Sequence, residues 1–314
     1  FLRRYTAYGF SACLVCLKVC QGNSLRDDKI LTAWSGLMIG AFARAALVLD
    51  RDDYETVAVE AAEFLLETLR DDEGRLMRSW LGQPRHRAYL EDYAFLIEGL
   101  LDLHETTGDV RWVREATELQ TELDTHFLHE GAHGGGYWMT ADDAEELLTR
   151  DKPSSDGAVP SGNSVEAMNL LRLAELTQDD TYRTKAERLF AAFSSSITRR
   201  GPGVTRLLAA LDRYTDTARE IVIVFDDDAA RDRMLQEVRT RFLPNRVLCV
   251  VRADQVEAAA AVVPLVDAKV LLPNSHATAY VCERGRCERP TSDPAEFGRQ
   301  IAAVRPYDPA PRPL

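Results

Sequence analysis

The chain has 314 residues, a formal net charge of −12 and 46% hydrophobic residues. This length and composition allow a full hydrophobic core and exclude a disordered chain. The negative charge argues against a nucleic-acid-binding protein, which needs a positive surface to contact phosphates. We therefore expect a folded cytoplasmic protein.

Residues 1–24 carry three cysteines at C-x₂-C-x₃-C spacing, Cys13, Cys16 and Cys20. That spacing suits a metal, an iron–sulfur cluster or a redox pair, but no fourth ligand lies nearby, and we favour small apolar side chains. A signal peptide is not expected because Lys18 interrupts the apolar run. No membrane span is expected because no run of 18 apolar residues occurs. The first residue, Phe1 rather than Met, indicates a fragment or a processed product.

Three pairs of helical segments follow. The pairs lie at 27–69, 90–128 and 161–197. The first helix of each pair is apolar around most of its circumference, whereas the second has one apolar stripe and a charged face. Each second helix opens with a polar turn and then an aromatic residue: Tyr54, Trp112 and Tyr182. A repeated α-hairpin that cannot bury its own apolar stripe predicts a solenoid or a closed toroid of stacked helix pairs.

The segments between and after the pairs predict the remaining organisation. Residues 71–87 and 129–160 are long irregular loops that can cover one rim of the toroid. After residue 216, β-branched runs alternate with helices, which predicts a small α/β unit with a partly parallel sheet. The expected strands are 220–225, 246–251, 268–272 and 277–282. The expected divisions are an N-terminal segment 1–24, a helical-hairpin domain 25–216, an α/β unit 217–305 and a disordered tail 306–314.

Three further cysteines lie in the α/β unit. Cys249 lies inside an apolar run and is expected in the core. Cys282 and Cys287 flank a turn-like stretch and can face each other across a hairpin. In a reducing cytosol we expect them to be thiols.

The candidate site is the rim where the inner helices begin, because unpaired backbone N–H groups and loops meet there. Asp28, Asp92 and His133 are the acid/base candidates. The candidate substrate-binding residues are Asp27, Trp34, Glu91, Tyr93, Trp138, Asp156, Ser161 and Asn163. Carboxylates, amides and aromatic rings in one concavity suit a polyhydroxylated ligand. Two carboxylates could cleave a glycosidic bond, whereas epimerisation would use a tuned His or carboxylate.

Structural explanations remain open for most of these residues. Acidic residues before or within a first helical turn also cap a helix and complement its dipole, which applies to Asp28 and Asp92. Trp34 and Tyr93 can be core residues, and Ser161 or Asn163 can cap the next helix. The segment 156–164, which contains two glycines and a proline, is more elaborate than capping requires.

Several motifs occur together in one order. They are DDKILTAWSGLMI at 27–39, LEDYAF at 90–95, DGAVPSGNS at 156–164 and AYVC at 279–282 with Cys287 and Pro290. In combination they resemble the thioredoxin-domain-containing family of spermatogenesis-associated protein 20. The resemblance covers about residues 26–299 and does not include the first 24.

The resemblance implies an N-terminal thioredoxin-like domain, absent from this chain, followed by an (α/α)₆ toroid similar to N-acylglucosamine 2-epimerases and six-hairpin glycosidases. This chain would be a C-terminal portion of such a protein. The family usually has Trp-Asn-Gly where this sequence has Trp34-Ser35-Gly36, and the paired histidines of a sugar epimerase are not clearly present.

The resulting hypothesis is a carbohydrate-active domain, epimerase-like or hydrolase-like, that takes a small sugar ligand and needs no cofactor or metal. Two alternatives stay open. One is a non-catalytic scaffold that serves a thioredoxin-like redox domain. The other is a truncated product that exposes an apolar edge.

Overall fold

A computed structural model of the chain describes residues 27–131, 134–145, 148–283 and 286–302. The predictions for Cys13, Cys16 and Cys20, for the segment 1–24, for His133 and for the tail 306–314 lie outside the described residues.

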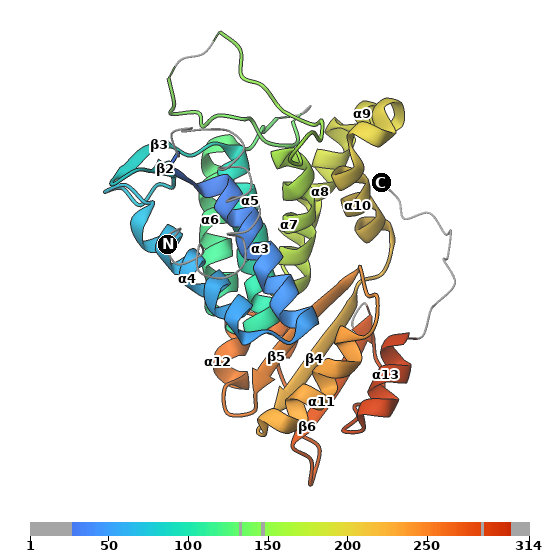
Figure 1. Ribbon diagram of the computed structural model, residues 1–314. Coiled ribbons are helices and arrows are strands. Elements are labelled where there is room, and N and C mark those ends of the chain that lie inside the picture. The colour runs from blue at the N-terminus through green and yellow to red at the C-terminus, as the bar shows by residue number, and fades with distance from the viewer. Residues whose placement is uncertain (1–26, 132–133, 146–147, 284–285, 303–314) are drawn as a thin grey trace, which may run out of the picture.

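Three helical hairpins form the larger part of the described chain (Figure 1). They are α3 (Thr32–Leu49) with α4 (Asp52–Thr68), α5 (Leu90–Thr107) with α6 (Arg111–Phe127), and α7 (Gly162–Thr177) with α8 (Asp180–Ala192). Each first helix ends at a residue in the left-handed region, Asp50, Gly108 and Gln178, with φ of 55°, 73° and 55°. A left-handed residue stops a helix and turns the chain back, so each second helix runs beside the first.

The hairpins stack through their first helices. Helix α3 packs against α5, α5 packs against α7, and α7 packs against α10 (Thr205–Thr215), whereas α4, α6 and α8 cover the outer side. Short α9 (Ser194–Arg200) and η1 (Gly201–Gly203) lead into α10. The prediction of a mainly α, toroid-type arrangement of hairpins with apolar inner helices and a small C-terminal α/β unit is confirmed.

The segment 71–87, expected to be an irregular loop, contains a β-hairpin. Strand β2 (Met77–Trp80) pairs antiparallel with β3 (Pro84–Arg87) and with β1 (Ile30–Leu31). The two residues of β1 were expected to begin the first helix. They are extended because Ile30 and Leu31 pair with Trp80 and Ser79, so that α3 begins at Thr32.

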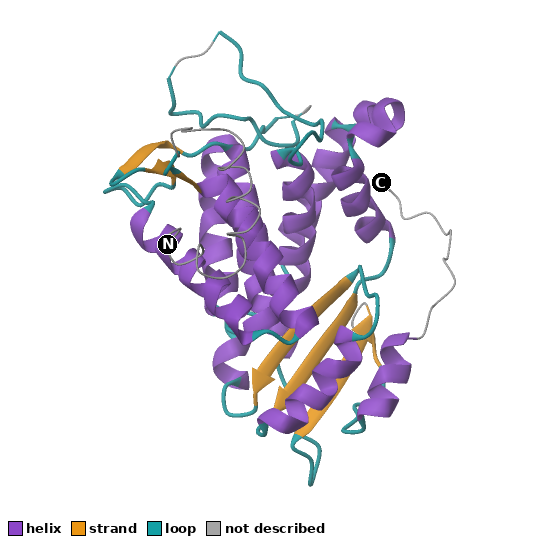
Figure 2. Cartoon of the chain, viewed as in Figure 1, coloured by secondary structure: helices purple, strands orange, loops and turns teal. Residues whose placement is uncertain are grey.

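The C-terminal α/β unit is built on a four-stranded sheet of order β5-β4-β6-β7 (Figure 2). Its strands are β4 (Arg219–Phe225), β5 (Arg246–Arg252), β6 (Ala277–Glu283) and β7 (Arg286–Cys287). Its helical segments are α11 (Asp228–Arg239), α12 (Val256–Ala260), η2 (Pro264–Val266) and α13 (Pro294–Ala302). Strands β4 and β5 are parallel and β6 is antiparallel to β4, so the prediction of a partly parallel sheet is correct.

Two predictions within this unit need correction. Residues 268–272 do not form a strand of the sheet, and side chains of β6 bond the segment instead. The Tyr280 hydroxyl contacts the backbone N and O of Val270, and Thr278 Oγ1 accepts from Leu272 N. Cys282 and Cys287 do pair across a hairpin, as expected, but they form a disulfide rather than two thiols.

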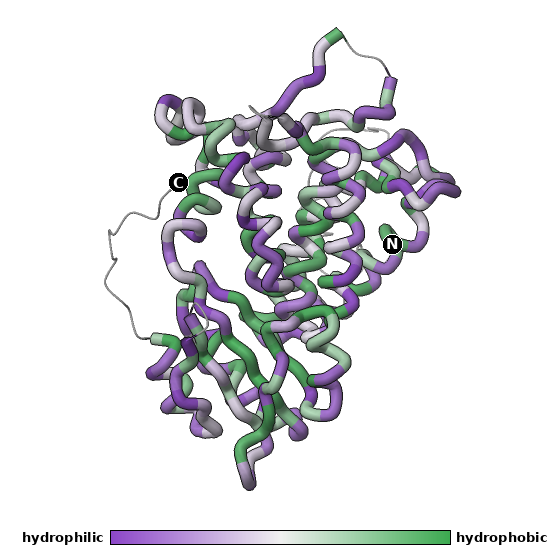
Figure 3. The backbone as a smooth tube through the Cα atoms, turned by 180° about the vertical axis from the view of Figure 1, so that it is seen from behind, coloured by the Kyte–Doolittle hydropathy of each residue, from purple (hydrophilic) through white to green (hydrophobic). Residues whose placement is uncertain are grey.

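The sheet has apolar side chains on both of its faces, and much of the backbone of its strands is coloured as hydrophobic in Figure 3. Because side chains alternate along a strand, Ile221, Ile223 and Phe225 of β4 join a cluster with residues of α11 and α13. Val222 and Val224 join the core of the helical hairpins. The α/β unit therefore shares one continuous core with the hairpins.

Helix α3 has an exposed apolar side, which we call the α3 open face: Trp34, Met38 and Val48 are 62%, 46% and 53% exposed. The opposite side, with Gly36 and Gly40, contacts α5. In length and composition α3 is the one helix of the described residues that could cross a membrane. The core helix of a folded protein can have the same length and composition, and eight of the 18 residues of α3 are buried.

Candidate functional site

The leading ends of α3, α5 and α7 lie together. Asp92 in the first turn of α5 accepts a hydrogen bond from Ala33 N of α3 at 3.0 Å. At the start of α7, a Cβ on Gly162 would lie 2.7 Å from Leu90 Cγ at the start of α5. Residues far apart in sequence therefore meet at this rim, as the hairpin pattern predicts.

Asp92 joins two of these helices. Its carboxylate accepts from Tyr89 N at 2.8 Å and from Ala33 N, and it lies 3.2 Å from Arg78 Nη1. The residue is 1% exposed, and burial raises the pKa of its carboxyl to about 6 although these donors oppose the shift. All of its contacts are structural, so the geometry assigns Asp92 to capping rather than to contact with a substrate.

Tyr93 is also buried, and its contacts are with other side chains of the core. Its ring is buried at 1% exposure and packs against Phe127, and its hydroxyl bonds Glu122 of α6. Burial and the neighbouring Glu122 charge raise its pKa well above the usual range. This placement corrects the expectation that Tyr93 offers a stacking surface.

The other rim candidates on α3 and α5 are accessible. Asp27 and Asp28 are exposed before α3, and Asp27 pairs with Lys29 at 3.3 Å. Glu91 is half-buried and pairs with Arg78 at 3.1 Å. Trp34 lies on the α3 open face, which points away from α5. These side chains remain candidates for ligand contact, although Trp34 and Asp92 do not face one another.

The side-chain amide of Asn163 forms hydrogen bonds with the backbone of the loop that precedes α7. Its Oδ1 accepts from Tyr137 N at 2.7 Å, and its Nδ2 donates to Tyr137 O and Pro153 O, both at 2.9 Å. The residue is 0% exposed. The amide therefore satisfies buried backbone groups, and its burial keeps it from contact with a sugar hydroxyl.

Asp156 and Ser161 hold the same loop. Asp156 Oδ1 accepts from Ser161 N at 3.0 Å and its Oδ2 accepts from Arg206 N of α10 at 2.8 Å. The Ser161 hydroxyl donates to Pro153 O at 2.9 Å. The unusual sequence of 156–164 thus ties the loop to α7 and α10, a structural role that capping alone does not describe.

Trp138 is half-buried in the loop 129–160. Its ring lies 4.7 Å from the His129 ring, and the charged groups of Arg150 and Lys152 lie 5.3 and 5.0 Å from its centroid. His133, the third acid/base candidate, is outside the described residues.

Sequence reasoning missed a row of acids on the side of α5 that faces away from α6. We call Glu98, Asp102 and Glu105 the acidic row; with 3.6 residues per turn they share one face of the helix. Leu100 and Tyr93 lie on the opposite face, toward α6. The spacing of these acids on an otherwise apolar helix could have indicated that they share a face. It could not have indicated which residues pair with them.

Arginines from four other elements meet the acidic row. Asp102 pairs with Arg44 of α3 and Arg172 of α7, both at 2.9 Å. Glu105 pairs with Arg172 at 3.1 Å and Arg246 of β5 at 3.2 Å.

Glu98 contacts Arg206 of α10 and lies 3.8 Å from Arg44. Arg44 is 53% exposed at its side chain and Arg206 26%, whereas Glu98 is 6% exposed. Burial and the nearby Arg44 charge lower the pKa of Arg206 to about 10. This end of the row presents two partly accessible guanidinium groups around one carboxylate, which offers both donors and an acceptor.

A second buried polar group lies inside the hairpin core. Glu166 of α7 is 0% exposed, and its Oε2 accepts from Asn169 Nδ2 at 3.3 Å. Burial, and then the charge of Asp124, raises the pKa of Glu166 to about 8. The raised pKa favours a protonated carboxyl near neutral pH.

We expect Glu166 to make stability depend on pH. Because its native pKa lies above the unfolded value, its contribution is complete below about pH 4.5 and is lost as pH rises through about 8, at up to about 1.4 kcal/mol per pH unit. Glu166→Gln should flatten this dependence and leave the variant more stable than the parent at alkaline pH. Urea unfolding at several pH values measures the free energy of unfolding and its dependence on pH. The exposed Glu118→Gln on α6 is the control, and equal slopes for parent and Glu166→Gln would contradict the assignment.

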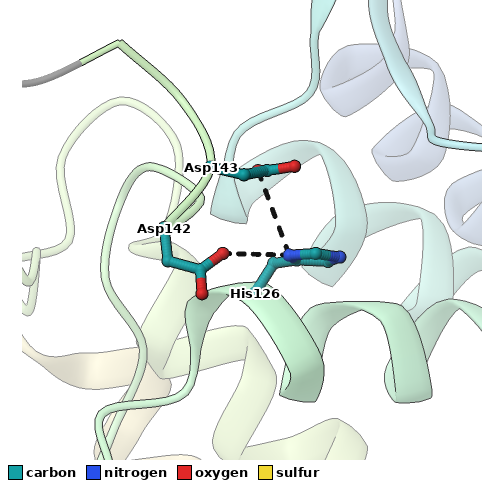
Figure 4. Close-up of side chains that lie close together, drawn as sticks. All are labelled: His126, Asp142 and Asp143. Carbon is teal, nitrogen blue, oxygen red and sulfur yellow. Dashed lines mark hydrogen bonds and ion pairs between the residues drawn. The ribbon is translucent and has the colours of Figure 1, made fainter.

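Among the described residues, His126, Asp142 and Asp143 bring three potential metal-ligating atoms within 4.8 Å of one another (Figure 4). His126 Nδ1 lies 2.9 Å from Asp142 Oδ1 and 3.9 Å from Asp143 Oδ1. Asp143 is already held by Arg75 at 2.7 Å and Arg87 at 2.8 Å. The positive charges of these two guanidinium groups would repel a metal cation bound at the Asp143 carboxylate. We therefore interpret the three residues as part of an ion-pair cluster.

Comparison with known proteins gives one clear relationship. No family model matches the chain. Spermatogenesis-associated protein 20 of Rattus norvegicus is 35% identical over 287 residues, and that of Homo sapiens is 36% identical over 287 residues; each match covers 88% of this chain and 36% of the relative. An uncharacterised protein of Caenorhabditis elegans is 31% identical over 277 residues.

Solved structures with partial similarity include cellobiose 2-epimerase from Bacillus thermoamylovorans, with 18% identity, a TM-score of 0.46, and coverage of 55% of this chain and 46% of that chain. A GH76 α-mannanase from Bacteroides thetaiotaomicron has 16% identity and a TM-score of 0.45, and the match covers 56% of this chain and 47% of that chain. The chain spans about a third of the length of the curated relatives it matches. The resemblance drawn from the sequence motifs is confirmed: over most of its length, this chain is related to spermatogenesis-associated protein 20.

Proposed function

We propose that the inner face of the helical hairpins binds a small carbohydrate at the end of the acidic row that holds Glu98. The observation that carries the proposal is the convergence of Arg44, Glu98 and Arg206 from three different inner helices. Guanidinium and carboxylate groups in a fixed arrangement can donate to and accept from several sugar hydroxyls at once.

One partly exposed apolar side chain, Leu37, lies on the same helix as Arg44. It packs against a small buried cluster that contains Ala33, Phe95 and Val165. Leu37 and Arg44 are seven residues apart on α3 and therefore share a face. A sugar has both hydroxyl and C–H surfaces, and it needs a partner of each kind.

The described residues support binding more strongly than catalysis. Asp92 is engaged in capping, and the carboxylate of Glu98 is held by guanidinium groups. An epimerase-like or hydrolase-like reaction would need a further accessible acid or base, for which Asp28, Glu91 and His133 remain the candidates. The thioredoxin-like domain implied by the resemblance would lie outside this chain.

A titration of mono- and disaccharides by calorimetry tests the proposal. Arg44→Ala removes a half-exposed side chain and should weaken binding about tenfold, which is about 1.4 kcal/mol, while Arg172 remains as a counter-ion of the buried Asp102. Arg114→Ala on the outer surface of α6 is the matched control and should bind like the parent. No detectable saccharide binding by the parent, or equal affinity in Arg44→Ala, would refute carbohydrate binding at this face.

A second candidate is a non-catalytic scaffold for a redox domain. It is favoured by one observation, that Asp92, Tyr93 and Asn163 make structural contacts rather than face a ligand. The α3 open face offers an apolar surface to such a domain. Absence of saccharide binding together with tight association of a thioredoxin-like domain would favour this candidate.

A further inference from the structure

Basic side chains gather around Trp138 on the loop that follows α6. We call His129, Arg150, Lys152 and Arg188 the loop basic cluster. Arg150 and Lys152 flank the Trp138 ring, and the His129 ring packs on it. Arg188 reaches the loop from α8, where its Nη2 donates to Gly131 O at 3.0 Å.

The charge of this cluster is not neutralised by carboxylates of the described chain. Within residues 27–131, 134–145, 148–283 and 286–302, Arg150, Lys152 and Arg188 take part in no ion pair within 4.0 Å, although the protein carries a net charge of −12. The surroundings of His129 show the same imbalance. Burial lowers its pKa, and the charges that lower it further are those of Lys152, Arg188 and Arg150.

Neutral acceptors fix these cations in place. Lys152 Nζ donates to His129 Nδ1 at 2.7 Å and to Gly135 O at 3.1 Å. An ammonium has three donors, so these two bonds leave one N–H for a ligand. Because His129 accepts at Nδ1, its Nε2 carries the proton and is a further donor.

Arg150 is anchored in the same way. Its Nη2 donates to Thr140 O and to His126 O near the end of α6. Its Nε is buried and has no hydrogen-bond partner within the described part of the chain. Carbonyl groups hold this guanidinium, but a carbonyl does not compensate a full positive charge.

We propose that the loop basic cluster binds a small phosphorylated molecule through its phosphoryl group. The charged groups of Arg150 and Lys152 lie 5.3 and 5.0 Å from the Trp138 ring, on which His129 packs, so that cations and a histidine N–H from one part of the loop can act as charge-assisted donors to a tetrahedral anion. A long polyanion is a poorer fit, because the negative charge of the whole protein would repel the parts of it beyond this cluster. The proposal is independent of carbohydrate binding by the acidic row.

Calorimetry of the full chain with inorganic phosphate, glucose 6-phosphate and glucose tests the inference. The parent should bind both phosphate probes, more weakly as salt is raised, and the cluster should contribute nothing to glucose binding. Lys152→Ala and Arg188→Ala should each weaken phosphate binding about tenfold. Arg188 is exposed on α8, so its variant should fold like the parent.

The control is Arg233→Ala, which removes an exposed arginine of α11 and should leave phosphate binding unchanged. Tighter binding of glucose 6-phosphate than of inorganic phosphate identifies a phosphorylated metabolite as the ligand, and equal binding identifies free phosphate. No binding by the parent, or undiminished binding by both Lys152→Ala and Arg188→Ala with an unchanged melting temperature, would overturn the proposal. Either result leaves the test of saccharide binding with Arg44→Ala unaffected.

Discussion

Asp92→Ala is expected to lower the free energy of unfolding by about 2 to 4 kcal/mol, because two helix starts lose their acceptor at once. Tyr89 N and Ala33 N would both be left without this partner in a buried region. Arg78 would also lose the carboxylate 3.2 Å from its Nη1. Urea unfolding followed by circular dichroism measures the loss.

Two substitutions at the same rim make the comparison specific. Asp92→Asn keeps one carbonyl oxygen and should cost less than Asp92→Ala, because one of the two N–H groups can still be satisfied. Glu91→Ala breaks only a half-exposed ion pair with Arg78 and should cost no more than about 1 kcal/mol. Equal effects of Glu91→Ala and Asp92→Ala would show that Asp92 does not tie α3 to α5.

Gly36→Ala is expected to destabilise the protein by at least about 2 kcal/mol, although alanine favours a helix over glycine by about 1 kcal/mol. A Cβ at this position would lie 2.6 Å from the carbonyl carbon of Phe95 and 2.7 Å from Leu96 N. These are backbone atoms of α5, which cannot rotate away as a side chain can. The two helices must therefore separate, and the loss can be measured by thermal and urea unfolding.

Gly157→Ala is the matched control. Its Cβ would have Val159 O, at 3.9 Å, as its nearest neighbour within 4 Å, so no overpacking is expected. The stability of this variant should lie within about 0.5 kcal/mol of the parent. If Gly36→Ala lowered the free energy of unfolding no more than Gly157→Ala does, the close approach of α3 and α5 at Gly36 would be contradicted.

The helices could be predicted because their signal is local. The charged side and the apolar stripe of α6 predict an outer helix. The apolar circumference of α5 predicts an inner helix. The hairpin of β2 and β3 was missed because its pattern, Met77-Arg-Ser-Trp80, is short and mixed, and its partner β1 lies far upstream. The segment 268–272 looked like a strand, but tertiary bonds from Tyr280 and Thr278 replaced a sheet partner.

The candidate site was harder to predict because function and capping use the same residue types. An acid in a first helical turn has one sequence signature whether it holds a substrate or a backbone N–H, and only the burial of Asp92 separates the two. The partners of Glu98 come from α3 and α10, and Arg206 lies 108 positions away in the chain. No spacing rule connects residues at that separation, so the acidic row became visible only in three dimensions.

The join between the hairpins and the sheet limits how this protein can vary. Glu105 of α5 takes Arg246 of β5 as a counter-ion, His104 lies 3.6 Å from the thiol of Cys249, and a Cβ on Gly108 would lie 2.1 Å from Val250 O. Each half thus supplies atoms that complete the interior of the other. The two halves cannot be exchanged as interchangeable modules, and a substitution at Arg246 or Gly108 must suit both of them together.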